Sequence, residues 1–321
     1  MKSRLRAVAG VIALFLSVAF PVRPVVPAQL FSLLAGPHPR SLASRASALD
    51  AGRRRSLPAP TWFFMQLSDP QFGMYTANAD FAQETANFEF AIAAANRLHP
   101  AFVVVTGDLV NKEGDAAQIA EYQRIAAKLD RAIPLYNVAG NHDVGNNPTP
   151  ATLAAYTKQF GPDHYTFRAD EFVGVVLDSS IIAAPQHVPE AFAEQERWLR
   201  VELERARRDA VRHIVIFQHH PWFLFFAEEP DQYFNIARER RDRYLALFQE
   251  FGVKHVFAGH YHQNALGYAT SIEMITSGPV GKPQGSSKSG VRIAIVSDSG
   301  ITHRYYEFGE IPNRIDVTKA P

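Results

Sequence analysis

Five short apolar runs in this sequence each end in side chains that can bind a metal ion. Runs of this length predict strands, and in open α/β sheets ligand sites form at the carboxyl ends of strands. We therefore expect these side chains to lie together at one edge of the fold. The candidate metal ligands are Asp69, Gln71, Asp108, Asn141, His219, His260 and His262.

The types and spacing of these candidates favour a centre of two metal ions. Carboxylates, carboxamides and imidazoles without thiolates suit Mn, Fe or Zn. Two residues that are two positions apart project to one side of an extended chain, which applies to Asp69 with Gln71 and to His260 with His262. A carboxylate shared by two cations can hold them ~3.5–4 Å apart, and such pairs stabilise both oxygens of a phosphoryl displacement. The residues alone therefore predict a hydrolase with two metal ions.

The elements that must position these side chains follow the rhythm of an α/β protein. From Trp62 onward, short apolar runs alternate with amphipathic stretches. Glycines directly precede three candidate ligands, as expected where the backbone turns sharply; they are Gly107, Gly140 and Gly259. Residues 190–208 and 238–243 mix charges of both signs, which predicts solvated helix faces and argues against a nucleic-acid-binding stripe.

The N-terminal sequence predicts an exported protein. Residues 2–6 carry positive charges, residues 7–20 are apolar, and small residues end at Ala28, so residues 1–28 resemble a cleavable signal peptide. The alternative is an uncleaved membrane anchor. Residues 29–60 are rich in Pro and Arg and predict a linker without packed structure. The catalytic domain is expected over residues 61–310, followed by a C-terminal tail, 311–321.

Composition excludes several classes of function. Lys and Arg total 33 against 32 for Asp and Glu, so no large field attracts nucleic acid or an anionic membrane. The sequence has no cysteine, which excludes disulfides, thiolate metal sites and cysteine nucleophiles. An anionic substrate must therefore be bound by local groups.

Other histidines and one aromatic segment have open interpretations. His213 and His255 begin their strands, so we expect them at the sheet edge opposite to the candidate ligands. Residues 221–235 contain several aromatic side chains between a candidate ligand and the next helix. This segment is either a loop whose aromatic side chains cap the core, or a lid or pocket wall beside the metals.

The order of the polar blocks resembles that of the calcineurin-like metallophosphoesterase superfamily over residues 62–308. The matching blocks are Asp69-Pro70-Gln71, residues 107–111, Gly140-Asn141-His142-Asp143, His219 and residues 259–262. Residues 68–73, 218–221, 233–235, 259–265 and 303–306 also resemble a narrower group, the calcineurin-like phosphoesterase domain-containing protein 1 type. Its eukaryotic members are described as serine/threonine protein phosphatases.

The resemblance implies a four-layer αββα sandwich, in which two mixed β-sheets lie face to face and helices flank them. It also implies that Asp108 bridges the two metals. The first metal would be bound by Asp69, Gln71, Asp108 and His262, and the second by Asp108, Asn141, His219 and His260. His219 is chosen over His220 because it matches the lone histidine of the family. His142 would lie outside the metal ligands and act on the phosphate or the leaving oxygen.

Two positions depart from the wider family. Gln71 replaces a histidine ligand, and because a carboxamide oxygen is a harder and weaker donor, the first site should favour Mn or load incompletely. Asn111 replaces the aspartate that orients the catalytic histidine in phosphoprotein phosphatases. A neutral amide stabilises an imidazolium less, so general-acid help from His142 should be reduced.

We predict hydrolysis of phosphomonoesters on a small molecule or a phosphoprotein, with phosphoserine and phosphothreonine as the class implied by the resemblance. A hydroxide that bridges the metals, formed from water whose pKa is lowered toward ~7, would attack in line. One alternative is a phosphodiesterase acting on nucleotides or lipid head groups, and another is a metal-binding module without catalysis. Export favours a small-molecule substrate, because phosphoproteins are found mainly inside cells.

Overall fold

Two mixed β-sheets form the centre of the protein. The computed structural model describes residues 61–319, so the predicted signal peptide and linker lie outside the described residues. The five-stranded sheet has the order β11 (Gly300–Glu307), β10 (Gly290–Ser297), β1 (Trp62–Leu67), β2 (Val103–Val105) and β3 (Leu135–Asn137). The six-stranded sheet has the order β4 (Tyr165–Ala169), β5 (Phe172–Val176), β6 (His213–Phe217), β7 (His255–Ala258), β9 (Ile272–Thr276) and β8 (Ala265–Ala269).

Within each sheet, the strands that precede the candidate ligands run parallel to one another. In the first sheet β1, β2 and β3 are parallel, while β10 and β11 are antiparallel additions. In the second sheet β5, β6, β7 and β9 are parallel, and β4 and β8 pair antiparallel at the edges. Parallel strands within a sheet place their carboxyl ends at the same edge.

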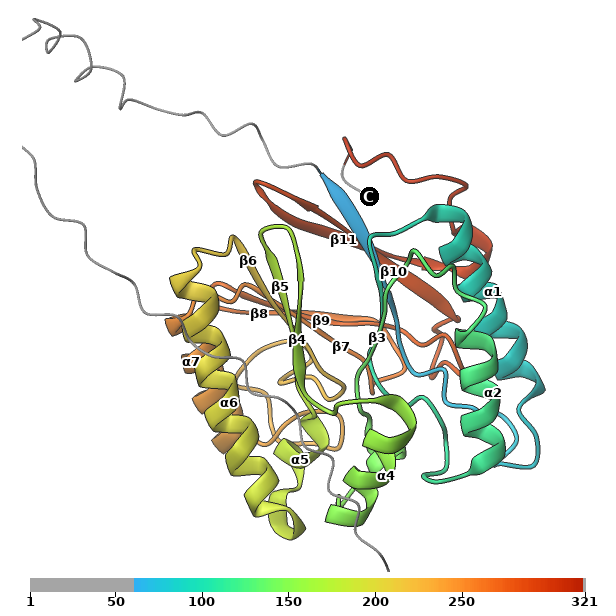
Figure 1. The fold of residues 1–321 in the computed structure, drawn as a ribbon, viewed down its shortest axis with the longest axis horizontal. Helices are drawn as coiled ribbons and strands as arrows, with labels where there is room; N and C mark the ends of the chain where they lie inside the picture. Colours follow the sequence, from blue (N-terminus) through green and yellow to red (C-terminus); the bar gives the residue numbers. More distant parts are fainter. Residues whose placement is uncertain (1–60, 320–321) are drawn as a thin grey trace, which may run out of the picture. The chain divides into compact units, whose positions relative to one another are not determined.

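Helices cover the outer face of each sheet. Figure 1 shows α1 (Ala82–Leu98) and α2 (Ala116–Ala126) on one side, and α6 (Pro189–Arg208) and α7 (Arg238–Glu250) on the other. Aspartate side chains cap the N-termini of two helices. Asp115 accepts hydrogen bonds from backbone N–H groups in the first turn of α2, and Asp178 does so for α5 (Ser179–Ala183). The remaining helices are α3 (Asn141–Val144), α4 (Pro150–Phe160) and the 3₁₀ turns η1 (Pro185–His187) and η2 (Phe308–Glu310). The predicted four-layer fold is confirmed.

Alternating side chains explain why both faces of the sheets are buried. Phe64 of β1 and Phe257 of β7 belong to a core between the sheets, where their ring centroids are 5.3 Å apart. The neighbouring residues Met65 and Val256 belong to a second core, which the helices cover. This period of two matches the pleat of a strand. The rings between the sheets therefore fix the distance between the two sets of strand ends.

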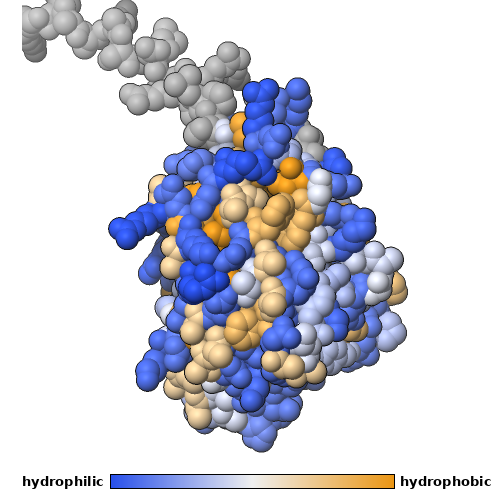
Figure 2. All heavy atoms as spheres, turned by 90° about the vertical axis from the view of Figure 1, so that its right-hand side faces the viewer, coloured by the Kyte–Doolittle hydropathy of each residue, from blue (hydrophilic) through white to orange (hydrophobic). Residues whose placement is uncertain are grey.

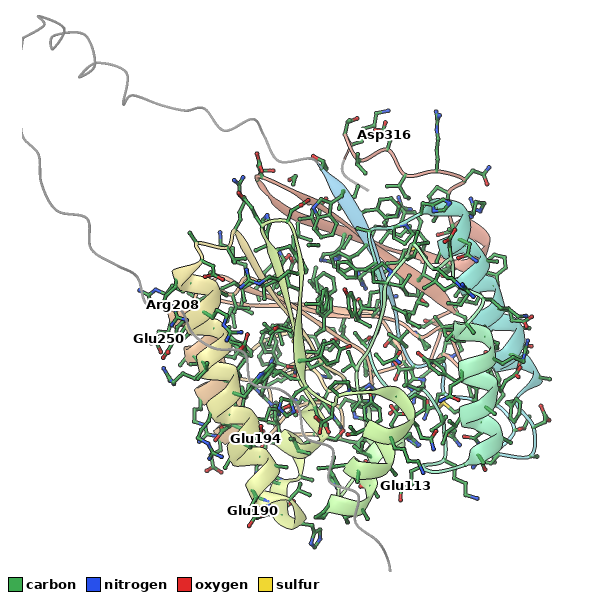
Figure 3. The ribbon with its side chains drawn as sticks, in the orientation of Figure 1. Glu113, Glu190, Glu194, Arg208, Glu250 and Asp316 are labelled. Atoms are coloured by element: carbon green, nitrogen blue, oxygen red, sulfur yellow. The ribbon has the colours of Figure 1, made fainter. Side chains whose placement is uncertain are left out.

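The outer helices differ in how far their charges are solvated. On α6, Glu190, Glu194 and Arg208 lie on the outer surface, as predicted (Figure 3). On α7, the prediction of a solvated face is wrong for Arg241, whose side chain is fully buried. Its guanidinium donates to the carbonyl oxygens of residues that precede the helix, so local hydrogen bonds offset the cost of burial.

The C-terminal segment packs against the domain. Ile311, Ile315 and Val317 contact the core beneath the helices, and Arg97 of α1 donates to the carbonyl oxygen of Pro312 at 2.8 Å. On the face that carries α1 and α2, a band of apolar side chains runs between polar ones (Figure 2). Phe90 of α1, which is 47% exposed, contacts the ring of Phe308 in η2. Residues 308–317 after β11 thus pack onto the folded domain.

Candidate metal centre

The loops that follow β1, β2, β3, β6 and β7 meet at one edge of the two sheets. The backbone N–H of Asp69 donates to the carbonyl oxygen of Gly107 at 3.2 Å, and Gly259 donates to His219 at 3.0 Å. The structure brings all seven candidate ligands together, and each is at most 3% exposed. They are Asp69, Gln71, Asp108, Asn141, His219, His260 and His262.

Two groups of carboxylates and imidazoles share Asp108. One contains Asp69, Asp108 and His262, the other Asp108, His219 and His260, and in each group the potential ligand atoms lie within 4.8 Å of one another. His219 Nε2 lies 3.2 Å from Asp108 Oδ2, and His262 Nε2 lies 3.4 Å from Asp69 Oδ1. The arrangement can bind two metal ions with one carboxylate between them.

Backbone carbonyls fix which imidazole nitrogens face the centre. His219 Nδ1 contacts the carbonyl oxygen of Thr106 at 2.8 Å, and His262 Nδ1 contacts that of Lys282 at 2.6 Å. His260 uses Nε2 instead, 3.0 Å from the carbonyl oxygen of Tyr233. Because a carbonyl only accepts hydrogen bonds, each of these nitrogens carries a hydrogen, and the other nitrogen of each ring is the one that can bind a metal when the ring is neutral.

The two amides are also oriented by their neighbours. Gln71 Nε2 donates to Asn111 Oδ1 at 3.2 Å, while Gln71 Oε1 is buried without a hydrogen-bond partner in the described part of the chain. Asn141 Nδ2 donates to Asn146 Oδ1 at 3.0 Å, and its Oδ1 lies 3.0 Å from His219 Nε2. A buried acceptor without a donor is costly, so Gln71 Oε1 suits a cation. The donor set fits the predicted metals.

Five of the candidate ligands have left-handed backbone conformations. The φ angles are 48° for Asp69, 40° for Gln71, 51° for Asp108, 68° for His260 and 55° for His262. Each non-glycine residue in this region costs of order 1 kcal/mol or more, and such strain gathers at functional sites. The turns direct side chains inward directly after the strands end.

Two of the three glycines that precede candidate ligands, Gly107 and Gly140, act in different ways. Gly107 has a φ of 86°, so the predicted sharp turn holds there, and a Cβ would also overlap the ring of His219. Gly140 has an extended backbone with a φ of −110°, which contradicts a turn at this position. It is required because a Cβ would overlap the backbone nitrogen of Asp108. Close approach of two loops is therefore its physical reason.

Charges in the centre depend on each other. Burial favours the neutral acid, but the charge and hydrogen bond of His219 lower the pKa of Asp108 well below its ordinary value. Burial opposes the charge on His219, but Asp108 raises the pKa of His219 to about 9. For His260, burial and the charge of His219 lower the pKa to about 3. In the metal-free protein at pH 7, the imidazole of His219 is thus doubly protonated and positively charged beside Asp108, while that of His260 is neutral.

His142 lies next to the centre and outside both groups. Its backbone N–H donates to Asp108 Oδ1 at 2.8 Å, and its Nδ1 contacts the backbone carbonyl oxygen of Asn111 at 2.7 Å. The side-chain amide of Asn111 instead binds Gln71 and Asn78. Since a carbonyl at this position orients the imidazole, the residue type at 111 does not weaken this contact.

Sequence reasoning placed Asp143 in a matching block but gave it no role, and in the structure it joins two loops. Its Oδ1 accepts the backbone N–H groups of Leu109 and Val110, and its Oδ2 accepts that of Gly140 at 2.8 Å. These bonds connect the loop after β2 to the start of α3. A capping pattern, with an acid three residues after Gly140, was the signal present in the sequence.

His220 and the aromatic segment of residues 221–235 lie beside the centre. His220 Nδ1 contacts Ser179 Oγ at 3.0 Å, and its ring centroid lies 4.3 Å from that of His260. In the segment, Trp222 and Phe223 are buried in the core, whereas Tyr233 is 60% exposed and lies 3.4 Å from Asn141. The segment therefore both caps the core and borders the centre.

Comparison with known proteins agrees with this geometry. The family model described as calcineurin-like phosphoesterase matches residues 64–264, which contain all seven candidate ligands. The chain belongs to this family. It is 35% identical over 290 residues to the serine/threonine-protein phosphatase CPPED1 of Bos taurus, covering 86% of this chain and 92% of that protein. The predicted family, its narrower group and the enzyme class of phosphoester hydrolases are confirmed.

Solved structures confirm the fold at low sequence identity. A dimetal phosphatase from Danio rerio aligns with a TM-score of 0.55 and 14% identity, covering 77% of this chain and 99% of that chain. Purple acid phosphatase PPD1 from yellow lupin aligns with a TM-score of 0.60 and 12% identity, covering 79% of this chain and 52% of that chain. The roles of the individual residues as ligands stay predictions.

Asp108→Ala should remove both metal ions, because this carboxylate is common to both groups. Asp69→Ala should remove only the first, since Asp69 belongs to one group. Metal content per chain, measured by elemental analysis after gel filtration, should fall from two to none and from two to one. An Asp108→Ala protein that keeps two metals would contradict the shared position of Asp108.

Metal uptake should release a proton from His219 and therefore depend on pH. The folded-state pKa of His219 is raised to about 9, and a histidine must be neutral to bind a metal. Below pH 9 the apparent affinity for the second metal should rise about tenfold per pH unit, and above pH 9 it should level off. Calorimetric titration at pH 7 in buffers of different ionisation enthalpy counts the released protons. Metal uptake without proton release would contradict the assignment of His219 as a ligand that loses a proton.

Proposed function

We propose that this protein hydrolyses phosphate monoesters at a centre of two metal ions. Two ligand groups that share Asp108, in a chain of the calcineurin-like phosphoesterase family, carry this proposal. The first metal is assigned to Asp69, Gln71, Asp108 and His262, and the second to Asp108, Asn141, His219 and His260. The buried and unpartnered Gln71 Oε1 supports the first assignment.

Mn, Fe or Zn suits this set of oxygen and nitrogen donors. Each site has one carboxamide, but the first has a single imidazole, that of His262, and the second has two, so the first site should favour Mn more than the second site does. When bound, the two ions supply Lewis-acid activation of the phosphoryl group and of the attacking water. The protein contributes a rigid, buried set of donors and a half-buried imidazole, that of His142, at the rim of the centre.

His142 is assigned the transfer of a proton to the leaving oxygen. Its Nδ1 is held by the carbonyl oxygen of Asn111, so Nε2 remains for the substrate. Its backbone N–H bond to Asp108 fixes the side chain relative to the shared carboxylate. A group positioned in this way can act as a general acid toward an alkoxide leaving group.

The relatives support the proposed substrate class. The similar proteins named CPPED1 are serine/threonine-protein phosphatases, and this chain covers 92% of the bovine protein. This supports phosphomonoesters as substrates, with phosphoserine and phosphothreonine side chains among them.

We also propose export on the basis of residues 1–28. Among the described residues 61–319, no helix has the length and apolar character required to cross a membrane.

The ester preference can be measured with two chromogenic substrates. Purified protein reconstituted with Mn, Fe or Zn should hydrolyse p-nitrophenyl phosphate, and much more slowly the bis(p-nitrophenyl) diester. Faster hydrolysis of the diester would replace the monoesterase with a phosphodiesterase. Hydrolysis of neither ester by protein that contains two metals would favour a metal-binding module without catalysis.

His142→Ala should lower kcat by about 10²–10⁴-fold if His142 is a general acid. The loss should be large with an alkyl phosphate and smaller with p-nitrophenyl phosphate, because p-nitrophenolate leaves without protonation. Metal content should remain that of the wild type. The matched control is His99→Ala, which changes an exposed histidine at the end of α1. An equal loss with both substrates would assign His142 to orienting the phosphate instead.

A further inference from the structure

The aromatic segment of residues 221–235 is held rigidly beside the centre. The carboxylate of Glu229 accepts the backbone N–H groups of Leu224 at 2.8 Å and Phe225 at 3.1 Å, and the side chain of Asn235 at 2.7 Å. The buried guanidinium of Arg241 donates to the carbonyl oxygens of Ala227 and Glu229. These bonds connect both arms of the segment, so its side chains are positioned before any ligand binds.

Tyr233 is the residue of this segment that contacts the centre. Its backbone carbonyl oxygen lies 3.0 Å from His260 Nε2, and its ring centroid lies 4.9 Å from the ring of His260. Its hydroxyl oxygen lies 3.4 Å from Asn141 Nδ2. Tyr233 therefore contacts two of the residues that we assign to the second metal.

The hydroxyl hydrogen of Tyr233 is free to donate to a ligand. Asn141 Nδ2 is a donor, so the phenol oxygen accepts in that contact. Among residues 61–319, no acceptor for the phenol hydrogen is observed. Tyr268 is equally exposed, at 60%, but its hydroxyl donates to Glu273 Oε1 at 2.8 Å. Within the described residues, Tyr268 thus has an acceptor for its hydroxyl hydrogen and Tyr233 has none.

We propose that the Tyr233 hydroxyl donates a hydrogen bond to a phosphoryl oxygen of the substrate at the second metal. This inference rests on the proposed function, because it requires a phosphate at that position. A phosphate bound beside Asn141 brings anionic oxygens within reach of the phenol, and hydrogen bonds to ionised acceptors are about twice as strong as neutral ones. Tyr233 and His142 come from different elements and bind the same group.

A purely structural role for Tyr233 can be separated from this one. The backbone carbonyl that orients His260 and the ring that packs on it are both retained in Tyr233→Phe. Only the hydroxyl is lost. Tyr268→Phe is the matched control, because it removes a hydroxyl from an equally exposed tyrosine outside the centre.

The test measures binding of inorganic phosphate to metal-loaded wild type, Tyr233→Phe and Tyr268→Phe by calorimetry, with metal content determined on the same samples. We expect Tyr233→Phe to bind phosphate about 10- to 100-fold more weakly, as for loss of a hydrogen bond to a charged group. Its metal content should equal that of the wild type. Tyr268→Phe should match the wild type in both measurements.

Each other outcome overturns the inference in a recognisable way. Unchanged phosphate affinity in Tyr233→Phe, with wild type binding phosphate, would reject the hydrogen bond and leave the proposed function intact. Slower ester hydrolysis at unchanged phosphate affinity would place the hydroxyl on the leaving group instead. Loss of metal together with phosphate would make Tyr233 structural. Metal-loaded wild type that binds no phosphate would reject the proposed function as well.

Discussion

A buried carboxylate needs nearby positive charge or hydrogen-bond donors, and in this protein that requirement concentrates on Asp108. Its side chain is 1% exposed, accepts the backbone N–H of His142 and lies 3.2 Å from His219. Its backbone carbonyl accepts from Gln71. Loops from both sheets therefore converge on one acid. In the metal-free protein the proton on His219 offsets its charge, and two cations would do so more fully.

This arrangement depends on sheets that do not move relative to each other. Phe64 and Phe257 pack between the sheets, so the ends of β1 and β7 stay at a fixed separation. The strained left-handed turns at Asp69 and Asp108 directly follow β1 and β2, and backbone hydrogen bonds from Asp69 to Gly107 and from Gln71 to Asp108 hold the two turns against each other. Gly140 and its missing Cβ then let the loop after β3 approach Asp108 closely. The geometry is thus prepared before metals bind, which lowers the cost of reorganisation.

The sequence predicted the residues of the centre but not the contacts that orient them. Strand-end patterns predicted the loops that carry the ligands because ligand chemistry depends on side-chain type, and the family resemblance selected His219 over His220. The carbonyl oxygen of Asn111 on His142 and that of Tyr233 on His260 were not predictable, because every residue has a carbonyl. Arg241 was expected in solvent because alternating charges are typical of exposed helices. Its burial depends on carbonyl groups of the segment directly before α7, and the charge pattern of the helix does not reveal how that segment folds back.

Anomalous X-ray diffraction from crystals of the metal-loaded protein tests the shared position of Asp108 most directly. Data collected at the Mn, Fe and Zn absorption edges locate each ion and identify its element. The account predicts two ions ~3.5–4 Å apart, with one oxygen or both oxygens of the Asp108 carboxylate bonded to the pair. A single ion, or two ions of which only one is bonded to Asp108, would contradict it.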